Sequence, residues 1–370
     1  MTSRGLEDVK ATSSKVTYID GNEGKLSYRG YDIKDLSTNS NFEETVYLLL
    51  YGELPTIKQL NELQKQMKEN RKIPDGVISI IKASSANTEL MDILRTSTSA
   101  LASSDPEYKE STHEARIRKS IRIISKIATV LAVVERTRKN EELIEPDSSL
   151  NHAGNFLYMI NGKKPNEKNS DLFDKCLIIH ADHELNASTF AARVTASTLS
   201  DVYSGVTSAI GTLKGPLHGG ANERVMQMLD EIKEPDRVSQ HIDNILENKQ
   251  KVMGFGHRVY KTIDPRAVIL KQLAKEMSSQ SSNKYFNMSL QIEEIMRQKK
   301  GLKPNVDFYA ASVYNMLEIP KHLFTPIFAC SRSSGWCAHI LEQLQNNRLI
   351  RPRSDYDGEI NRIYSDVDSR

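Results

Sequence analysis

The long apolar pattern near the middle of the chain constrains the fold more than any other feature. Apolar residues recur there at steps of three and four, which is typical of one long helix packed along one side. A shorter stripe with the same spacing follows Pro55 and Thr56, where a helix start is expected. The sequence therefore predicts a mainly α protein. The two stripes are Ile117, Ile121, Ile124, Ala128, Leu131 and Val134, and Leu60, Leu63 and Met67.

One β-like exception lies near the start of the chain. Residues 16–19 and 25–28 are rich in β-branched and aromatic types, and the turn-forming residues 20–24 separate them. We therefore predict a small hairpin there and not the core of a sheet.

Composition limits the class of protein. The 370 residues allow two domains, and 50 basic against 48 acidic residues leave a net charge of +2. Nothing therefore draws the whole chain to nucleic acid or to a membrane. The three cysteines are widely spaced, which predicts neither a disulfide framework nor a zinc ribbon. No run of 18 apolar residues and no signal-peptide core is present, so we expect a soluble cytoplasmic protein.

His218 is the first candidate for chemistry. Gly215 and Pro216 break the chain before it, so a second domain is expected to begin here, and an apolar stripe follows. This arrangement places the imidazole at a helix N-terminus, where the dipole lowers the pKa and keeps a neutral ring that can donate to a developing oxyanion. A simple capping histidine is the alternative. Gly219 and Gly220 favour the functional interpretation, because they clear space for a ligand.

His257 and Arg266 frame a second segment. His257 follows Gly254, Phe255 and Gly256, a loop that exposes amide groups. A third glycine and a preceding strand pattern are missing, so the loop is not a dinucleotide-binding fingerprint. Arg266 falls in the first turn of an expected helix, a position that the dipole disfavours for a cation unless an anion binds there.

Asp307 and Arg332 complete the candidates from the residues alone. Asp307 opens an apolar helical run and is either an ordinary first-turn acid or a base made stronger by partly apolar surroundings. Arg332 lies among small residues with no acid in its segment, so a buried guanidinium there would need an anion such as a carboxylate. Arg351, taken alone, reads as part of a solvated basic tail.

His180, His183 and Glu184 raise the possibility of a metal site. Two histidines three apart on a helix share a face, and the adjacent carboxylate could assist. The segment does not match HExxH and has no evident third ligand, so polar packing or substrate binding is the preferred role for His183.

Several motifs, taken together and in order, resemble the citrate synthase family. They cover the chain from Val16 to Ser354, and the overall length is similar to the compact prokaryotic form. The resemblance rests on residues 18–21, 26–31, 48–55, 180–186, 215–222, 254–266 and 305–309.

The resemblance implies a two-domain, mainly α fold and a homodimer. Residues 1–214 and 321–370 would form the large domain, and residues 215–320 would form a smaller inserted domain that binds CoA. The cleft between them would hold the active site, and the C-terminal part would contact the partner subunit.

The resemblance also implies roles for the candidate residues in joining acetyl-CoA to oxaloacetate. His218 would donate to the thioester carbonyl, Asp307 would remove a methyl proton, and His257 would polarise the oxaloacetate ketone. Citryl-CoA would then be hydrolysed to citrate and CoA. The substrate carboxylates would meet His183, Arg266, Arg332 and, from the other subunit, Arg351, which reverses the interpretation of Arg351 as a solvated tail residue.

For the CoA moiety the resemblance implies the loop Gly254, Phe255 and Gly256, with Lys261 and Lys303 near the phosphates. It implies no metal and no permanently bound cofactor, acetyl-CoA being a co-substrate. A 2-methylcitrate synthase that uses propionyl-CoA, or an enzyme of dual specificity, stays open, because one methylene is worth only about 1–3 kcal/mol of discrimination. A helical binding protein with idle catalytic groups is the alternative from another class.

Overall fold

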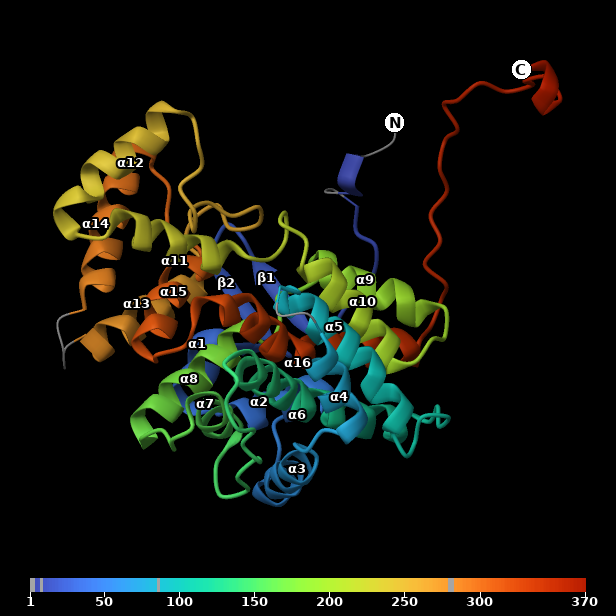
Figure 1. Cartoon of the computed structure of the whole chain (residues 1–370), viewed down its shortest axis with the longest axis horizontal. Helices are drawn as coiled ribbons and strands as arrows, with labels where there is room; N and C mark the ends of the chain where they lie inside the picture. Colours follow the sequence, from blue (N-terminus) through green and yellow to red (C-terminus); the bar gives the residue numbers. More distant parts are fainter. Residues whose placement is uncertain (1–3, 7–8, 85–86, 279–282) are drawn as a thin grey trace.

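The computed structural model describes residues 4–6, 9–84, 87–278 and 283–370. These residues form sixteen α-helices, five short 3-10 helices and one three-stranded sheet, which confirms the predicted mainly α class (Figure 1). The 3-10 helices are η1 (Arg4–Leu6), η2 (Ala102–Ser104), η3 (Pro235–Arg237), η4 (Lys321–Leu323) and η5 (Val367–Ser369).

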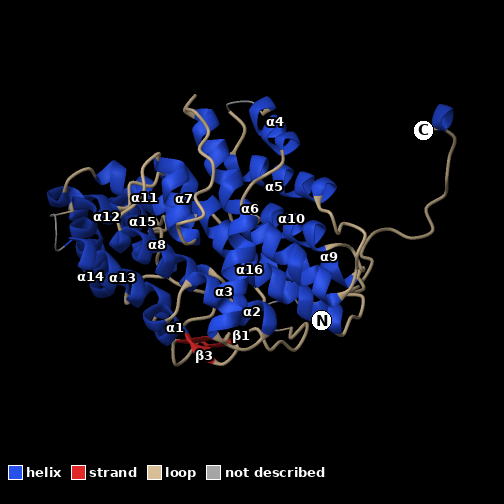
Figure 2. Ribbon diagram, turned by 90° about the horizontal axis from the view of Figure 1, so that it is seen from below, coloured by secondary structure: helices blue, strands red, loops and turns tan. Residues whose placement is uncertain are grey.

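The predicted hairpin is present. Strand β1 (Thr17–Asp20) pairs antiparallel with β2 (Lys25–Tyr28), and the Asp20 carboxylate orders the turn by accepting two backbone N–H groups. The sequence did not predict the third strand, β3 (Tyr31–Asp32), which pairs with β2. Arg29 and Gly30 make that return possible, because both adopt positive φ. Figure 2 shows the small sheet at one edge of the helical body, beside α1.

The first group of helices begins after the sheet. Helix α3 begins after Thr56, as expected from the sequence, and buries Leu63 and Met67. Thr56 and Gln59 form a capping box at this start, which was not predicted from the sequence. The helices of this group are α1 (Ile33–Asn39), α2 (Phe42–Tyr51), α3 (Ile57–Glu69), α4 (Asp75–Ala83), α5 (Leu90–Leu101), α6 (His113–Arg138), α7 (His152–Asn161), α8 (Glu167–His180), α9 (Ala187–Ser197) and α10 (Val202–Leu213).

Helix α6 is the predicted long helix, but it is not packed along one side only. Residues 127–135 are all buried, and α3, α4, α5, α7, α10 and α16 contact the helix. The expectation that only one side of this helix is packed was wrong. Between Ile127 and Val134 the only polar residue is Thr129, so the C-terminal half of the helix has no polar face to turn toward water. Helix α6 is therefore a central element of the core.

The second group of helices packs mainly on itself. Helix α13 contacts α15, α15 contacts α11, and α12 contacts α14, and in Figure 1 this group forms the yellow-to-orange side of the molecule. Its members are α11 (Ala221–Ile232), α12 (Val238–Glu247), α13 (Pro265–Ser278), α14 (Lys284–Lys300) and α15 (Val306–Met316). The division at residues 214/215 and 320/321 into two domains is our proposal for this arrangement.

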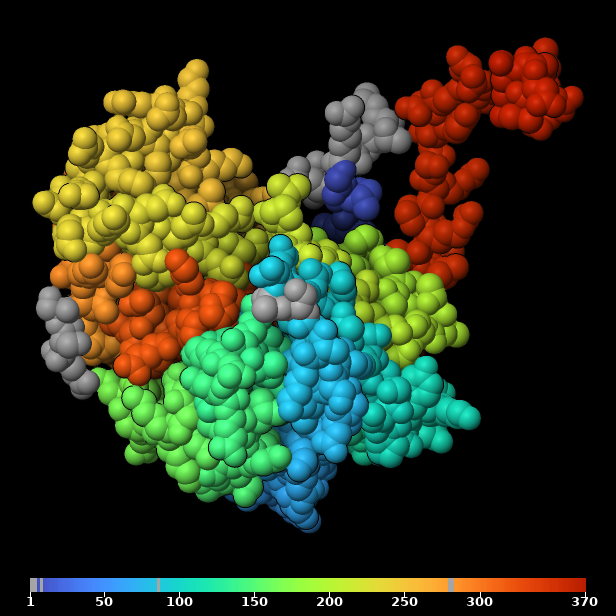
Figure 3. Space-filling model, viewed as in Figure 1, coloured from blue at the N-terminus to red at the C-terminus, as the bar shows by residue number. Residues whose placement is uncertain are grey.

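Helix α16 (Phe324–Gln345) returns the chain to the first group, where it packs against α2, α6, α8, α9 and α10. Beyond it, residues 351–370 are exposed and stand away from the body (Figure 3). All three cysteines are buried free thiols. Among the described residues, no helix is long and apolar enough to cross a membrane.

Candidate active site

Residues from both groups of helices meet where the hairpin, the end of α8 and the starts of α13 and α15 come together. The His183 and His257 rings lie 5.3 Å apart, and His218 contacts Ser188 at the start of α9. The positive charges of Arg266 and Arg332 both lower the pKa of Asp307, although burial outweighs them. The structure therefore brings together every catalytic and substrate-binding residue proposed from the sequence except Arg351.

His218 lies in the turn before α11, two residues ahead of the Gly220 N-cap. Its Nε2 lies 3.2 Å from the backbone nitrogen of Ser188 and 2.8 Å from Oγ of the same residue. A backbone N–H can only donate, so Nε2 accepts and the ring proton is on Nδ1. Burial, assisted by the Arg332 charge, lowers the pKa of His218 to about 4. Burial, and not the helix dipole expected from the sequence, is the main cause of this lowered pKa.

His257 is held in the opposite tautomer. Its Nδ1 accepts the backbone N–H groups of Val259 at 3.0 Å and Tyr260 at 3.2 Å, which leaves the proton on Nε2. Burial, with the neighbouring Arg266 charge, lowers the pKa of His257 to about 4. Both rings are therefore neutral hydrogen-bond donors at neutral pH.

His183 lies beyond the end of α8, and the next residue, Glu184, has a positive φ. Its Nε2 is 3.2 Å from the Tyr260 hydroxyl, and burial lowers its pKa well below the usual range. His180 is the last residue of α8, so the two histidines do not share a helix face and that premise of the metal alternative was wrong. Within the described ranges, no group of three His, Cys, Asp or Glu residues is placed to hold a metal ion.

Arg266 forms a buried ion pair with Asp264. Its Nε and Nη2 bind the two carboxylate oxygens of Asp264 at 3.0 and 2.9 Å. Burial alone would raise the pKa of Asp264, but the guanidinium outweighs burial and holds that pKa below its usual range. Asp264 also accepts the backbone N–H of Val306 at 3.0 Å, so one carboxylate joins α13 to the start of α15. The sequence alone did not identify Asp264 as the partner of Arg266.

Arg332 has an unused donor. The side chain is buried in the middle of α16, where Nε donates to the carbonyl of His180 at 2.8 Å and the guanidinium lies 4.6 Å from the Phe328 ring centre. Nη2 is buried and has no hydrogen-bond partner among the described residues. Burial lowers the pKa of Arg332 to about 10. A bound carboxylate would satisfy this donor and compensate the buried charge.

Asp307 lies in the first turn of α15, after the Asn305 N-cap that accepts its backbone N–H at 3.0 Å. Burial raises the pKa of Asp307 to about 6, although the Arg266 charge acts in the opposite direction. A carboxylate with a pKa near neutrality is a stronger base than an ordinary aspartate and is still ionised at pH 7.

The loop proposed for CoA is fixed to the segment before α15. The carbonyl of Gly254 accepts the N–H of Asn305 at 2.9 Å, and Gly256 donates to the carbonyl of Lys303 at 3.3 Å. Gly254 has a φ of 80°, and a Cβ there would lie 2.8 Å from the Phe308 side chain, so only glycine fits. Phe255 packs edge-on against Phe308, with ring centres 4.6 Å apart.

Three sequence-predicted residues lie outside the buried cluster. Lys261 and Lys303 are exposed on the loop and beside it, and Arg351 is exposed after α16. Two further site residues were not predicted from the sequence: Ser188, which contacts His218, and Tyr260, whose hydroxyl contacts His183. Position in the motif could have suggested Tyr260, three residues after His257. Ser188 lies 30 residues from His218, so only the folded chain reveals it.

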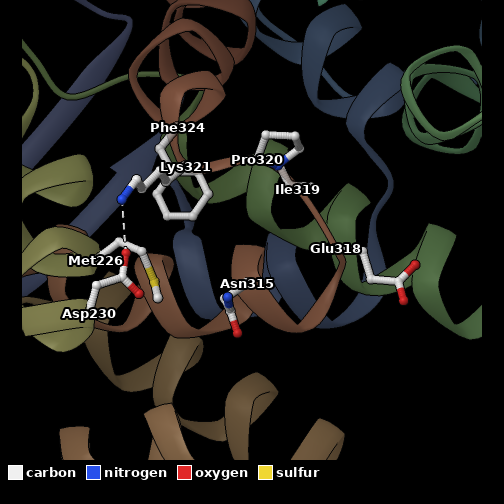
Figure 4. A pocket seen from close by; sticks show the side chains of 8 residues that line it. All are labelled: Met226, Asp230, Asn315, Glu318, Ile319, Pro320, Lys321 and Phe324. Carbon is white, nitrogen blue, oxygen red and sulfur yellow. Dashed lines mark hydrogen bonds and ion pairs between the residues drawn. The ribbon is translucent and has the colours of Figure 1, made fainter. Parts of the chain in front are cut away.

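A separate pocket of about 300 Å³ lies between α11, α15 and the start of α16 (Figure 4). An ion pair of 3.0 Å joins Lys321 to Asp230 on its wall, next to Phe324. None of the predicted site residues lines this pocket.

Residues 5–353 match the family model described as citrate synthase, C-terminal domain. The chain is 50% identical over 370 residues to citrate synthase 2 of Bacillus subtilis, covering 100% of this chain and 99% of that protein. It is 41% identical to 2-methylcitrate synthase 2 of Corynebacterium glutamicum, covering 99% and 97%. Among solved structures, a ternary complex of carboxymethyl coenzyme A and oxaloacetate with citrate synthase from Thermoplasma acidophilum has a TM-score of 0.94 and 37% identity, covering 100% of both chains.

Proposed function

This chain belongs to the citrate synthase family and is an acyltransferase, and from that premise we propose that it condenses acetyl-CoA with oxaloacetate and water to give citrate and CoA. The observation that carries the proposal is the combination of two neutral histidines in fixed, opposite tautomers with a carboxylate of raised pKa. Proton removal next to a thioester needs such a base together with a donor already aimed at the enolate oxygen.

In the proposed reaction, Asp307 removes a proton from the acetyl methyl group while the Nδ1–H of His218 donates to the thioester oxygen. The Nε2–H of His257 polarises the oxaloacetate ketone, which the enol attacks to form the new carbon–carbon bond. Water then cleaves the thioester of citryl-CoA and releases citrate and CoA. Neutral donors suit this role, because no charge must be reorganised as the oxyanion develops.

The substrate carboxylates are assigned to His183, Arg266 and Arg332, with the buried Nη2 of Arg332 as the strongest support. Arg351 of a second subunit is proposed to complete this set in a homodimer. Gly254, Phe255, Gly256, Lys261 and Lys303 are proposed to bind CoA. We further propose that oxaloacetate binds first and draws the two domains together, so that water is excluded before acetyl-CoA reacts. As part of the same proposal, the enzyme works in the cytoplasm at the entry to the tricarboxylic acid cycle.

A thiol-release assay with oxaloacetate tests the proposal. Release of CoA thiol from acetyl-CoA, dependent on oxaloacetate, is expected, together with citrate as the product. A higher kcat/KM for propionyl-CoA would instead indicate a 2-methylcitrate synthase, the activity named for the Corynebacterium relative. Absence of thiol release with both substrates would contradict the proposed function.

A further inference from the structure

The β1–β2 hairpin contacts the two segments that carry His183 and His257. At its open end, the Thr17 hydroxyl donates to the Asp182 carboxylate at 2.5 Å, and the Tyr28 hydroxyl donates to the Asp182 carbonyl at 2.9 Å. Both hydrogen bonds are buried. The strands therefore fix the residue directly before His183.

The turn of the hairpin contacts the other segment. The carbonyl of Gly21 accepts the backbone N–H of Lys261 at 2.8 Å, and a Cβ added to Gly21 would lie 2.2 Å from the carbonyl oxygen of Val259. At Gly24, where φ is +68°, a Cβ would lie 2.7 Å from the carbonyl oxygen of Ile263. At both positions the nearest atom is a backbone carbonyl oxygen. A clash with an added Cβ could therefore not be relieved by moving a side chain, so both positions require glycine.

The segment held by the turn is the one that orients His257. The backbone N–H groups of Val259 and Tyr260 both donate to its Nδ1, and the Tyr260 hydroxyl lies 3.2 Å from Nε2 of His183. A displacement of Val259 would therefore move the donors that fix the His257 tautomer and the Tyr260 hydroxyl that contacts His183.

We propose that the β1–β2 hairpin sets the position of His257 relative to His183 and that Gly21 is a positioning residue for the oxaloacetate site. The inference rests on the proposed function, because it assigns both histidines to oxaloacetate. The two ends of the hairpin contact residues 182 and 259–263, one on each side of the proposed domain boundary at residue 214, and in the view of Figure 1 its strands lie between α11 and α9. The hairpin thus sets the distance between the segment that carries His183 and the segment that carries His257.

The Gly21→Ala variant tests this role, and Gly76→Ala is its matched control. Gly76 lies in α4, where nothing stands within 4 Å of an added Cβ. Since ångström-scale misplacement of catalytic groups is costly, Gly21→Ala should lower kcat/KM for oxaloacetate at least about tenfold. The KM for acetyl-CoA should stay within about twofold of wild type, because the displaced histidines are assigned to oxaloacetate. Gly76→Ala should match wild type in all constants.

The outcomes separate the hairpin role from general destabilisation. A KM for acetyl-CoA that rises as much as the KM for oxaloacetate, or constants like those of Gly76→Ala, would overturn the inference. If Gly21→Ala does not fold, as judged by circular dichroism, Thr17→Val decides by the same criteria, because it removes the hydroxyl bound to Asp182 and keeps the side-chain shape. A wild-type protein without thiol release contradicts the proposed function, whereas an active wild type with an unaffected Gly21→Ala contradicts only the hairpin role.

Discussion

Asp307 combines a functional demand with a cost to the fold. Its carboxylate sits in the first turn of α15 under the opposing influence of burial, which raises its pKa to about 6, and of the Arg266 charge. The protonated form is therefore favoured in the folded protein relative to the unfolded chain. At pH 7 the Asp307 carboxyl is mostly ionised. Proton abstraction needs this ionised form, but the partly desolvated site disfavours it.

Replacement of Asp307 by Asn should abolish the base without changing its shape. We expect kcat to fall about 10³-fold, within the usual range for a general base. Oxaloacetate affinity, measured by calorimetry, should stay within about threefold, because the carboxylate is not assigned to that substrate. In the wild type, kcat should decline as the pH falls through 6, where Asp307 takes up its proton. A kcat of Asp307→Asn above about a tenth of the wild-type value would show that Asp307 is not the base.

The same Asp307→Asn variant should also be more stable than wild type at pH 8. Because the folded pKa lies above the unfolded value, the penalty on folding is absent below about pH 4, grows between about pH 4 and pH 6, and is complete above about pH 6. Asparagine mimics the protonated carboxyl, so Tm should rise by a few degrees at pH 8, and the gain should shrink as the pH is lowered from about 6 to about 4. Scanning calorimetry at about pH 8 and about pH 5 measures this, and an unchanged Tm at pH 8 would contradict the burial cost.

At the scale of elements, the start of α13 and the start of α15 depend on one carboxylate. Asp264 accepts three donors from Arg266 and one from Val306, and both charged side chains are almost completely buried. The pair thereby fixes the arginine assigned to substrate against the helix that carries Asp307. Neither member of such a buried pair can be removed without leaving the other uncompensated.

The Asp264→Asn variant should therefore lose about 3–5 kcal/mol of stability, the usual cost of breaking a buried ion pair from one side. Asp171→Asn is the matched control, because Asp171 is exposed and pairs with Lys175 on the surface of α8. This substitution should cost at most about 0.5 kcal/mol. Urea unfolding monitored by circular dichroism measures both. Equal, small losses would show that the Asp264 pair does not hold the two helices.

The elements also show what the sequence could and could not predict. Local signals predicted the hairpin, the start of α3 at Thr56 and the place of Asp307 in a first turn, because each depends on residues close in sequence. The partner that fixes the ring proton of His218 depends on chain packing, because Ser188 lies 30 residues away. Asp264, the partner of Arg266, lies only two residues away, but this spacing alone does not show that the two side chains pair. The core position of α6 was missed because periodicity identifies an apolar face but not how many neighbours cover it.

At the scale of the whole molecule, the candidate site of one chain is incomplete in the proposed mechanism. The helices of both groups and α16 supply the buried cluster, but Arg351 is exposed in a segment that leaves the body (Figure 3). Arg332 keeps a buried donor without a partner among the described residues. A dimer in which Arg351 of each chain completes the site of the other would account for the position of this segment.

Mixing two inactive variants tests whether Arg351 acts across subunits. Arg351→Ala and Asp307→Asn should each be nearly inactive alone. After co-refolding of equal amounts, about half of the dimers would be mixed, and one of their two sites would have both residues intact, so activity should recover to about a quarter of wild type. His218→Ala mixed with Asp307→Asn is the control, because both groups belong to the same chain's site and no activity should return. If the Arg351→Ala mixture also stays inactive, Arg351 does not serve the partner's site.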